Sequence, residues 1–508
     1  MAVAAEQVPE KVVPPPAQTS ADPAQFRKLL ELAGWNATRF ATFDKAGPLA
    51  DEDQQELVEL LWRLKTFDGP QLTDWARAGA SGKEIAAAPS EHVGEIVELA
   101  GRVTRVERHA LSAELAARLE MPAYFECQMM LDGGAGMATI LTSRVPKAWL
   151  ELQSLDEPAE SAGVLIRLLS STNGSTDRLF VSREIAWHPK QPHAPFVSLG
   201  ESVLGELGVD VGLLDDVRQR RPISAAEREA FYQMLDASGR IGTNQLTRFA
   251  SQDLDAVEKH WAAEEQRLAA TLKDSPPGGN PRDRVRLQLA HEVQARAAKG
   301  QYSVAPLFND AENRVGELVT LDGAARRVTR VDVGTSADGT TSDVARRFGI
   351  DHYYEIDVFT EDSQNNPVVF CVRELPPGFP LGDGLQEPVR IAGFFFKSWS
   401  FQSRRATLPD AQVDAAPAGD MRQFAPLLIG RGPILIDEAD ASASDSTGLI
   451  AAGLFVVLLG AIWAAGWWLA RDDRRFVETT LAKQFSLAEG ESLNDVDFDL
   501  SESTREHE

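Results

Sequence analysis

Aromatic and basic side chains alternate in one short stretch in the second half of the chain. The segment GFFFKSWSFQSRR at 393–405 places Lys397, Arg404 and Arg405 beside phenylalanines and Trp399. Small β-barrels use this combination to bind single-stranded nucleic acid, because bases stack on aromatic rings while cations meet the phosphates. We therefore take Lys397, Trp399, Arg404 and Arg405 as candidate interaction residues.

The charge balance argues against nucleic acid as the partner. A nucleic-acid binder needs an excess of Lys and Arg on at least one face. The 508-residue chain has 51 basic and 76 acidic residues, a formal net charge of −25. The segments 93–184 (9 basic, 13 acidic) and 315–430 (11 basic, 16 acidic) are each acidic as well. The simpler reading of the three phenylalanines at 394–396 is a barrel core and an interface to a neighbouring module.

A second group of candidate residues comes from an internal repeat, which is best sought before local structure. The motif V-G-E-x-V-x-L-x-G occurs at 93–101 and again at 315–323. R-V-T-R-V follows at 102–106 and at 327–331. The offset between the copies rises in small steps along the chain, as loop insertions produce in a duplicated domain.

Two charged residues recur within this repeat. Arg118 and Glu126 match Arg347 and Glu355 at an offset of 229. An acid and a base present in both copies are the residue types that line a polar ligand site. The alternative is structural, because such residues often cap a helix or form a surface ion pair, and this is the interpretation we favour.

Known catalytic and metal motifs are absent from the sequence. It contains no Walker loop, G-x-G-x-x-G, G-x-S-x-G, H-E-x-x-H or C-x-x-C. Of eight histidines only the two in HPKQPH (188–193) lie close together, and the prolines exclude a regular helix there. We expect no catalytic, cofactor-binding or metal-binding residues and no cofactor. The two cysteines, Cys127 and Cys371, fit buried free thiols better than an inter-unit disulfide.

The hydrophobic pattern predicts an α+β protein that repeats one unit twice. Each unit begins with a helical lead-in, and the second holds about 48 additional residues with two further helical patterns. Five strands follow in unit one, with apolar residues alternating along two of them. A long first strand with a glycine in its middle (Gly101, Gly323) favours an OB-like five-stranded barrel over a sandwich or meander.

An uncharged run of 21 residues begins at Leu449 and ends at Leu469. At 1.5 Å per residue it would cover roughly 30 Å, which predicts one C-terminal transmembrane helix. Acidic residues precede the run and Arg471, Arg474 and Arg475 follow it, so we expect the tail inside and the bulk outside the cytoplasm. The opposite orientation stays open, because the first residues carry only the small-x-small end of a signal peptide. A G-x-x-x-A pattern at 460–464 allows a homodimer through the span.

These signals divide the chain into eight expected segments. They are a disordered N-terminus (1–22), a helical lead-in (23–90), an OB-like module (91–190), a second helical region (200–310), a second OB-like module (311–436), a tether (437–448), the span (449–470) and an acidic cytoplasmic tail (471–508).

The stretch VRIAGFFFKSWSFQS, followed by FAPLLIGRGPI ahead of a single span, is similar to uncharacterised planctomycete single-pass membrane proteins. The resemblance covers about 60 residues from Val389 and implies a bacterial, membrane-anchored protein without implying an activity. With no catalytic constellation, we expect a non-enzymatic binding or scaffold protein of the cell envelope with a protein partner. The alternatives are single-strand nucleic-acid binding on the cytoplasmic face and an enzyme of unrecognised type.

Overall fold

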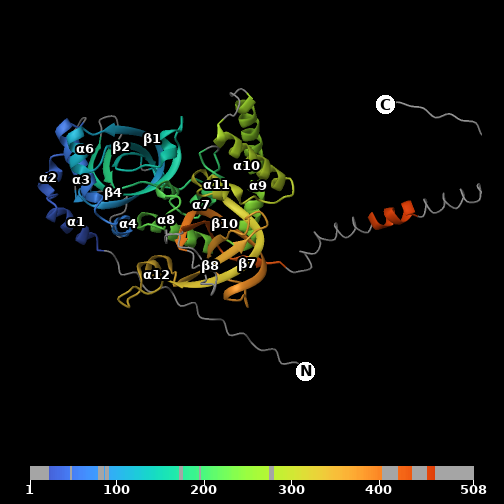
Figure 1. Ribbon diagram of the computed structural model, residues 1–508. Helices are drawn as coiled ribbons and strands as arrows, with labels where there is room; N and C mark the ends of the chain where they lie inside the picture. The colour runs from blue at the N-terminus through green and yellow to red at the C-terminus, as the bar shows by residue number, and fades with distance from the viewer. Residues whose placement is uncertain are drawn as a thin grey trace, which may run out of the picture. The chain divides into compact units, whose positions relative to one another are not determined.

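The computed structural model divides the chain into two compact units, Met1–Leu435 and Ile436–Glu508. It describes residues 22–45, 49–77, 85, 88, 91–134, 136–170, 176–193, 196–273, 280–402, 422–436 and 455–463. The first unit contains two β modules, each preceded by helices (Figure 1).

Module 1 is a closed β-barrel. The order β1-β2-β3-β5-β4 closes because β4 also pairs with β1, and β3 and β5 are the parallel pair. Its strands are β1 (Ile96–Ala110), β2 (Ala123–Leu131), β3 (Gly136–Thr142), β4 (Glu157–Ser170), β5 (Thr176–Ser182) and the short β6 (Ala186–Trp187).

Module 2 repeats this topology strand for strand. The order is β7-β8-β9-β11-β10, β10 returns to β7, and β9 and β11 are the parallel pair. The predicted mixed α+β class with a five-stranded barrel is therefore confirmed. The strands are β7 (Leu318–Asp332), β8 (His352–Phe359), β9 (Val368–Val372), β10 (Gly382–Gln402), β11 (Arg422–Gly430) and β12 (Pro433–Leu435).

The repeated glycines have a steric reason. A Cβ atom on Gly101 would lie 2.2 Å from the Met130 carbonyl oxygen, and one on Gly323 would lie 2.6 Å from that of Phe359. Each glycine therefore lets the second strand approach the first. The register shift of a β-bulge follows two residues later in both modules.

The repeated V-G-E motif is a turn that enters the barrel. Gly94 and Gly316 have φ angles of +84° and +83°, which favour glycine. The amide of Gly94 donates to the Leu165 carbonyl oxygen, and the amide of Leu165 donates to that of Glu95. In module 2 the amide of Gly316 donates to the Phe395 carbonyl oxygen, and the amide of Phe395 donates to that of Glu317.

Helices precede and connect the strands. In module 1 the lead-in packs against the outer barrel face, where Val164 and Ile166 of β4 share a buried cluster with Leu57 and Leu61 of α3 (Figure 1). The described helices are α1 (Pro23–Leu32), α2 (Ala37–Ala41), α3 (Asp51–Leu64), α4 (Gly69–Arg77), α6 (Ala113–Leu119), α7 (Leu199–Glu206), α8 (Ala225–Arg240), α9 (Thr243–Lys273), α10 (Pro281–Ala297), α11 (Ala305–Asn309) and α12 (Asp343–Phe348), with short 3-10 helices η2 (Asp132–Gly134), η3 (Lys147–Leu150), η4 (Val211–Asp216) and η5 (Ala311–Asn313).

The three consecutive phenylalanines of β10 serve two cores. Phe395 lies inside barrel 2, whereas Phe394 and Phe396 belong to the cluster outside it, where the ring of Phe396 packs with Phe231 of α8. The interpretation of these phenylalanines as core and interface is therefore confirmed.

Of the second unit the structure describes residue 436 and residues 455–463, and the latter are helical. The rest of the predicted span, the tether and the tail lie outside the described residues. Within the described ranges, no helix combines the length and the apolar character needed to cross a membrane.

Candidate binding site at the end of module 2

Lys397, a candidate surface cation, is fully buried in an ion pair. Its Nζ lies 2.6 Å from Oε1 of Glu227, the third residue of α8, and both side chains are almost completely inaccessible. Glu227 also accepts the backbone amides of Arg218 (2.7 Å) and Ser224 (2.6 Å). Lys397 therefore anchors β10 to the beginning of α8 and presents no charge at the surface.

The pKa directions agree with a structural pair. Burial lowers the pKa of Lys397, although the bond to Glu227 opposes that shift. Burial alone would raise the pKa of Glu227, but the hydrogen bonds from Lys397, Arg218 and Ser224 outweigh it and the pKa is lowered. Glu227 is thus held ionised, as a carboxylate accepting several hydrogen bonds should be.

The equivalent position of module 1 also carries a buried cation. A bulge precedes Arg167 in β4 as one precedes Lys397 in β10. Arg167 donates to the Lys45 carbonyl oxygen at 3.3 Å, in the segment that leads to α3. The sequence carries a further signal for this match, because E-P-x-x-x-A-G begins at Glu157 and again at Glu387, an offset of 230.

The repeated arginines also fasten lead-in helices. Arg118 of α6 contacts Glu59 of α3 at 2.9 Å, and Arg347 of α12 contacts Glu229 of α8. Neither arginine contacts its repeat glutamate in the described contacts. The structure therefore places Arg118 and Arg347 as ties between helix and barrel.

A third pair of cations caps the far end of each lead-in helix. Arg183, just after β5, donates to the Phe67 carbonyl oxygen beyond α3. Arg431, just after β11, donates to the carbonyl oxygens of Gly239 and Ile241 at the end of α8. Cations at a helix C-terminus satisfy its free carbonyl groups.

The repeat glutamates occupy less similar surroundings. Glu126 is partly exposed and lies 3.7 Å from Nε2 of His109. Burial raises the pKa of Glu355, while nearby Arg327 lowers it. In the region that the structure describes, no group of three or more His, Cys, Asp or Glu side chains is placed to hold a metal ion.

The rest of the aromatic stretch is only partly described. Trp399 is half-buried and packs against the large core cluster, and Arg404 and Arg405 lie outside the described residues. The guanidinium of exposed Arg220 lies 5.8 Å from the ring centre of Phe424, next to the β10–β11 edge. Arg220, from the segment before α8, therefore supplies a cation beside an aromatic ring of this strand pair, the role that the sequence suggested for Lys397.

The end of module 1 is covered by the chain's own connecting segment. Arg144, after β3, donates to the Gly212 carbonyl oxygen at 2.6 Å and pairs with Asp216 at 2.9 Å. The amide of Lys147 donates to a carboxylate oxygen of Asp215 at 2.8 Å. Charged and polar contacts of this kind hold η4 against the loop that contains η3.

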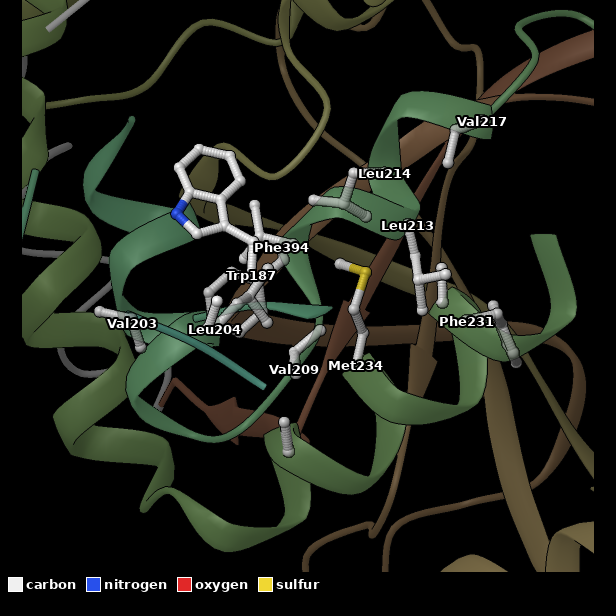
Figure 2. Packing of buried hydrophobic residues seen from close by; sticks show 14 of the residues in the cluster. Trp187, Val203, Leu204, Val209, Leu213, Leu214, Val217, Phe231, Met234 and Phe394 are labelled. Carbon is white, nitrogen blue, oxygen red and sulfur yellow. The ribbon is translucent and has the colours of Figure 1, made fainter. Parts of the chain in front are cut away.

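Apolar contacts complete this cover. Trp187 of β6 is 3% exposed, and the same cluster extends to the interior of barrel 1, to α8 and to the outer face of module 2. Figure 2 shows its members from the connection, from α8 and from β10: Trp187, Val203, Leu204, Val209, Leu213, Leu214, Val217, Phe231, Met234 and Phe394.

The equivalent end of module 2 carries a pocket of about 320 Å³. Leu435, which pairs with β10 as Trp187 pairs with β4, is 43% exposed, and Leu381 is 56% exposed. The lining residues come from the beginning of β8 and from the loop after β9: His352, Tyr354, Arg373, Glu374, Leu375, Pro376, Gly378, Phe379 and Leu381.

The pocket has the Phe379 side chain at its floor and, among the described residues, a cation without an ion pair. Phe379 is buried beneath it in the barrel 2 core. Glu374 pairs with Arg431 at 2.6 Å. No hydrogen bond or ion pair joins the Arg373 guanidinium to any residue that the structure describes. A smaller hollow of about 240 Å³ continues from Arg373 to Asp236 and Arg240 of α8.

Sequence patterns did not identify this site, because its residues lie in and around a Leu-Pro-Pro-Gly loop that matches no known binding motif. The available signal was the match of Val145-Pro146 with Leu375-Pro376, which places the two loops in equivalent positions. The family models that were searched give no match to the chain, and no curated protein matches it.

Proposed function

We propose that this protein is a non-enzymatic binding or scaffold protein, with two OB-like modules derived by duplication and the open end of module 2 as the partner-binding site. The observation that carries the proposal is the difference between the two barrel ends. Residues 210–216 cover the end of module 1, whereas the described residues leave apolar side chains exposed at the end of module 2. An open pocket that places charged and polar groups beside apolar side chains can bind a ligand and fix its orientation.

The joined modules suit a scaffold. One continuous cluster links barrel 1, the connecting segment, α8 and module 2, so a bound partner would be held at a defined position. The cations repeated in both modules hold helices to barrels. These side chains are therefore engaged in structural contacts, which favours a binding protein over an enzyme or a phosphate-binding protein.

We further propose that the protein is anchored in a bacterial envelope membrane through residues 449–469, with the bulk outside the cytoplasm. Support comes from the uncharged run, from the arginines that follow it and from the resemblance to planctomycete single-pass proteins. Protease treatment of cells with a permeabilised outer layer tests this orientation. Digestion of the bulk is expected, and its protection would contradict the proposal.

Site-specific photo-crosslinking tests the binding function. A benzophenone amino acid at Leu381 should give protein adducts in cells, because this side chain is 56% exposed beside the pocket. Leu150 of module 1 is the matched control, since it is 50% exposed in the corresponding loop. Adducts at Leu381 that are absent at Leu150 support the site; no protein adduct at Leu381 contradicts it.

A second candidate function is single-strand nucleic-acid binding at the β10–β11 edge. Arg220 over the 43% exposed ring of Phe424, with exposed Arg218 and Arg221 nearby in sequence, is the observation in its favour. At low salt, an oligo(dT) strand should then bind, and Arg220→Glu should abolish binding. Absence of binding by the unmodified chain at low salt would remove this candidate.

A further inference from the structure

The connecting segment shows what chemistry covers a barrel end in this protein. Leu213 and Leu214 are buried in the shared cluster, and the next two residues, Asp215 and Asp216, contact cations of the module 1 loop. The two adjacent leucines therefore pack on the apolar residues at the barrel end, and the two carboxylates that follow pair with the cations around it. The cover is a short peptide that lies across the end of the barrel.

The end of module 2 offers matching features, and no described residue covers it as 210–216 cover module 1. Phe379 takes the place of Trp149, which is buried in module 1, and both belong to a barrel-end apolar cluster. Arg373 supplies a cation on the loop after β9, as Arg144 does on the loop after β3. The two loops differ in detail, because Glu374 stands where module 1 has Arg144, yet it is already paired with Arg431.

We propose that the pocket of module 2 binds an acidic peptide segment of a partner protein, with adjacent large apolar residues followed by carboxylates. The apolar pair would pack on Phe379 and Leu381, and a carboxylate would reach the guanidinium of Arg373. This proposal rests on the proposed binding function and specifies its ligand. Charge complementarity and the chain's own cover of the equivalent barrel end carry it.

The region available to a bound peptide extends beyond the pocket itself. The adjoining hollow at the end of α8 provides length for an extended peptide, and its charges at Asp236 and Arg240 lie 3.1 Å apart in an ion pair. Arg373 lines both hollows, so its charge lies centrally along the path of a bound segment. A carboxylate there would form the charge-assisted hydrogen bonds that arginine makes well.

Fluorescence anisotropy with the full chain in detergent tests this ligand class. The probe is a labelled nonapeptide that copies residues 209–217 (VDVGLLDDV), compared with the same peptide carrying lysines in place of its last two aspartates. Saturable binding of the acidic peptide is expected, at least tenfold tighter than that of the lysine peptide. Arg373→Glu and Leu381→Asp should each weaken it at least tenfold, whereas Arg105→Glu, on 62% exposed Arg105 of module 1, should leave it unchanged.

Because Leu381 is exposed, its variant should fold even if Arg373→Glu does not. The ligand assignment would be overturned if the wild-type chain failed to bind the acidic peptide. It would also be overturned if neither Arg373→Glu nor Leu381→Asp changed the affinity. Equal binding of the lysine peptide would also overturn it. If crosslinked protein adducts form at Leu381 while the peptide fails to bind, the binding function stands and only this ligand class is wrong.

Discussion

The two barrels share strand order, bulges and helix-fastening cations, yet their equivalent ends differ. In module 1 the segment after β6 returns over the loop at 143–150, and Trp187 is 3% exposed. In module 2 the corresponding Leu435 is 43% exposed, and the loop after β9 lines a pocket of about 320 Å³. Duplication therefore repeats the barrel interior, whereas the cover that residues 210–216 form on module 1 has no counterpart among the residues described around module 2.

The largest expected effect concerns the covered end. Trp187→Ala should lower the free energy of unfolding by about 3–5 kcal/mol, because it leaves a large cavity in a cluster that joins both modules. Leu435→Ala, at the open end, should change it by no more than about 0.5 kcal/mol. Urea unfolding of the full chain in detergent, followed by circular dichroism, compares the two; equal effects would contradict the difference between the ends.

The buried ion pair comes next. Lys397→Met should cost about 3 kcal/mol, because it leaves the Glu227 carboxylate buried without its cation. The double variant Lys397→Met/Glu227→Gln should recover part of this loss, since Gln can still cap α8. The same urea midpoints measure both. A double variant less stable than the single one would show that Glu227 does not depend on Lys397.

Asp210, in the cover of module 1, gives a pH-dependent prediction. Burial raises its pKa to about 7, although the amides of Trp187 and Gly212 donate to its carboxylate. The folded state then binds more protons than the unfolded state between about pH 4 and 7, so stability falls as pH rises through that window.

Asp210→Asn keeps the acceptor oxygen and removes the charge. It should raise stability by about 1–2 kcal/mol at pH 8 and flatten the pH dependence, with little gain at pH 4. Thermal unfolding of the full chain at several pH values tests this, with exposed Glu114→Gln as control. Unchanged pH dependence in the Asp210 variant would contradict a buried, destabilising charge.

The smallest expected effects compare the loop cations. Arg144→Ala should cost about 1–2 kcal/mol, because it removes contacts to Gly212 and Asp216 that hold the cover. Arg373→Ala should cost no more than about 0.5 kcal/mol. Limited proteolysis within 206–217 should also accelerate only in the Arg144 variant. If Arg373→Ala destabilised the protein as much as Arg144→Ala, Arg373 would have a structural role, and this result would contradict its proposed role in binding.

The sequence alone determined the barrel-entry turns, the two faces of the strands and the fold class, because these features depend on residues close together in the chain. The turn at V-G-E needs a glycine with positive φ, so the motif recurs wherever the barrel begins, at Gly94 and Gly316. Alternation along a strand separates two faces, which put Phe395 opposite Phe394 and Phe396, and the structure then showed that Phe395 is the one in the barrel core. The α+β class and the five-stranded barrels followed from such patterns.

Only the tertiary structure decided what each cation does. Lys397 resembles a surface lysine in sequence, but folding brings it to Glu227, 170 residues earlier in the chain, and a buried charge takes whatever partner the packing supplies. The open end of module 2 was equally inaccessible to pattern reading. Whether a barrel end is covered depends on the path of the chain beyond the barrel, and no periodicity within the barrel encodes that path.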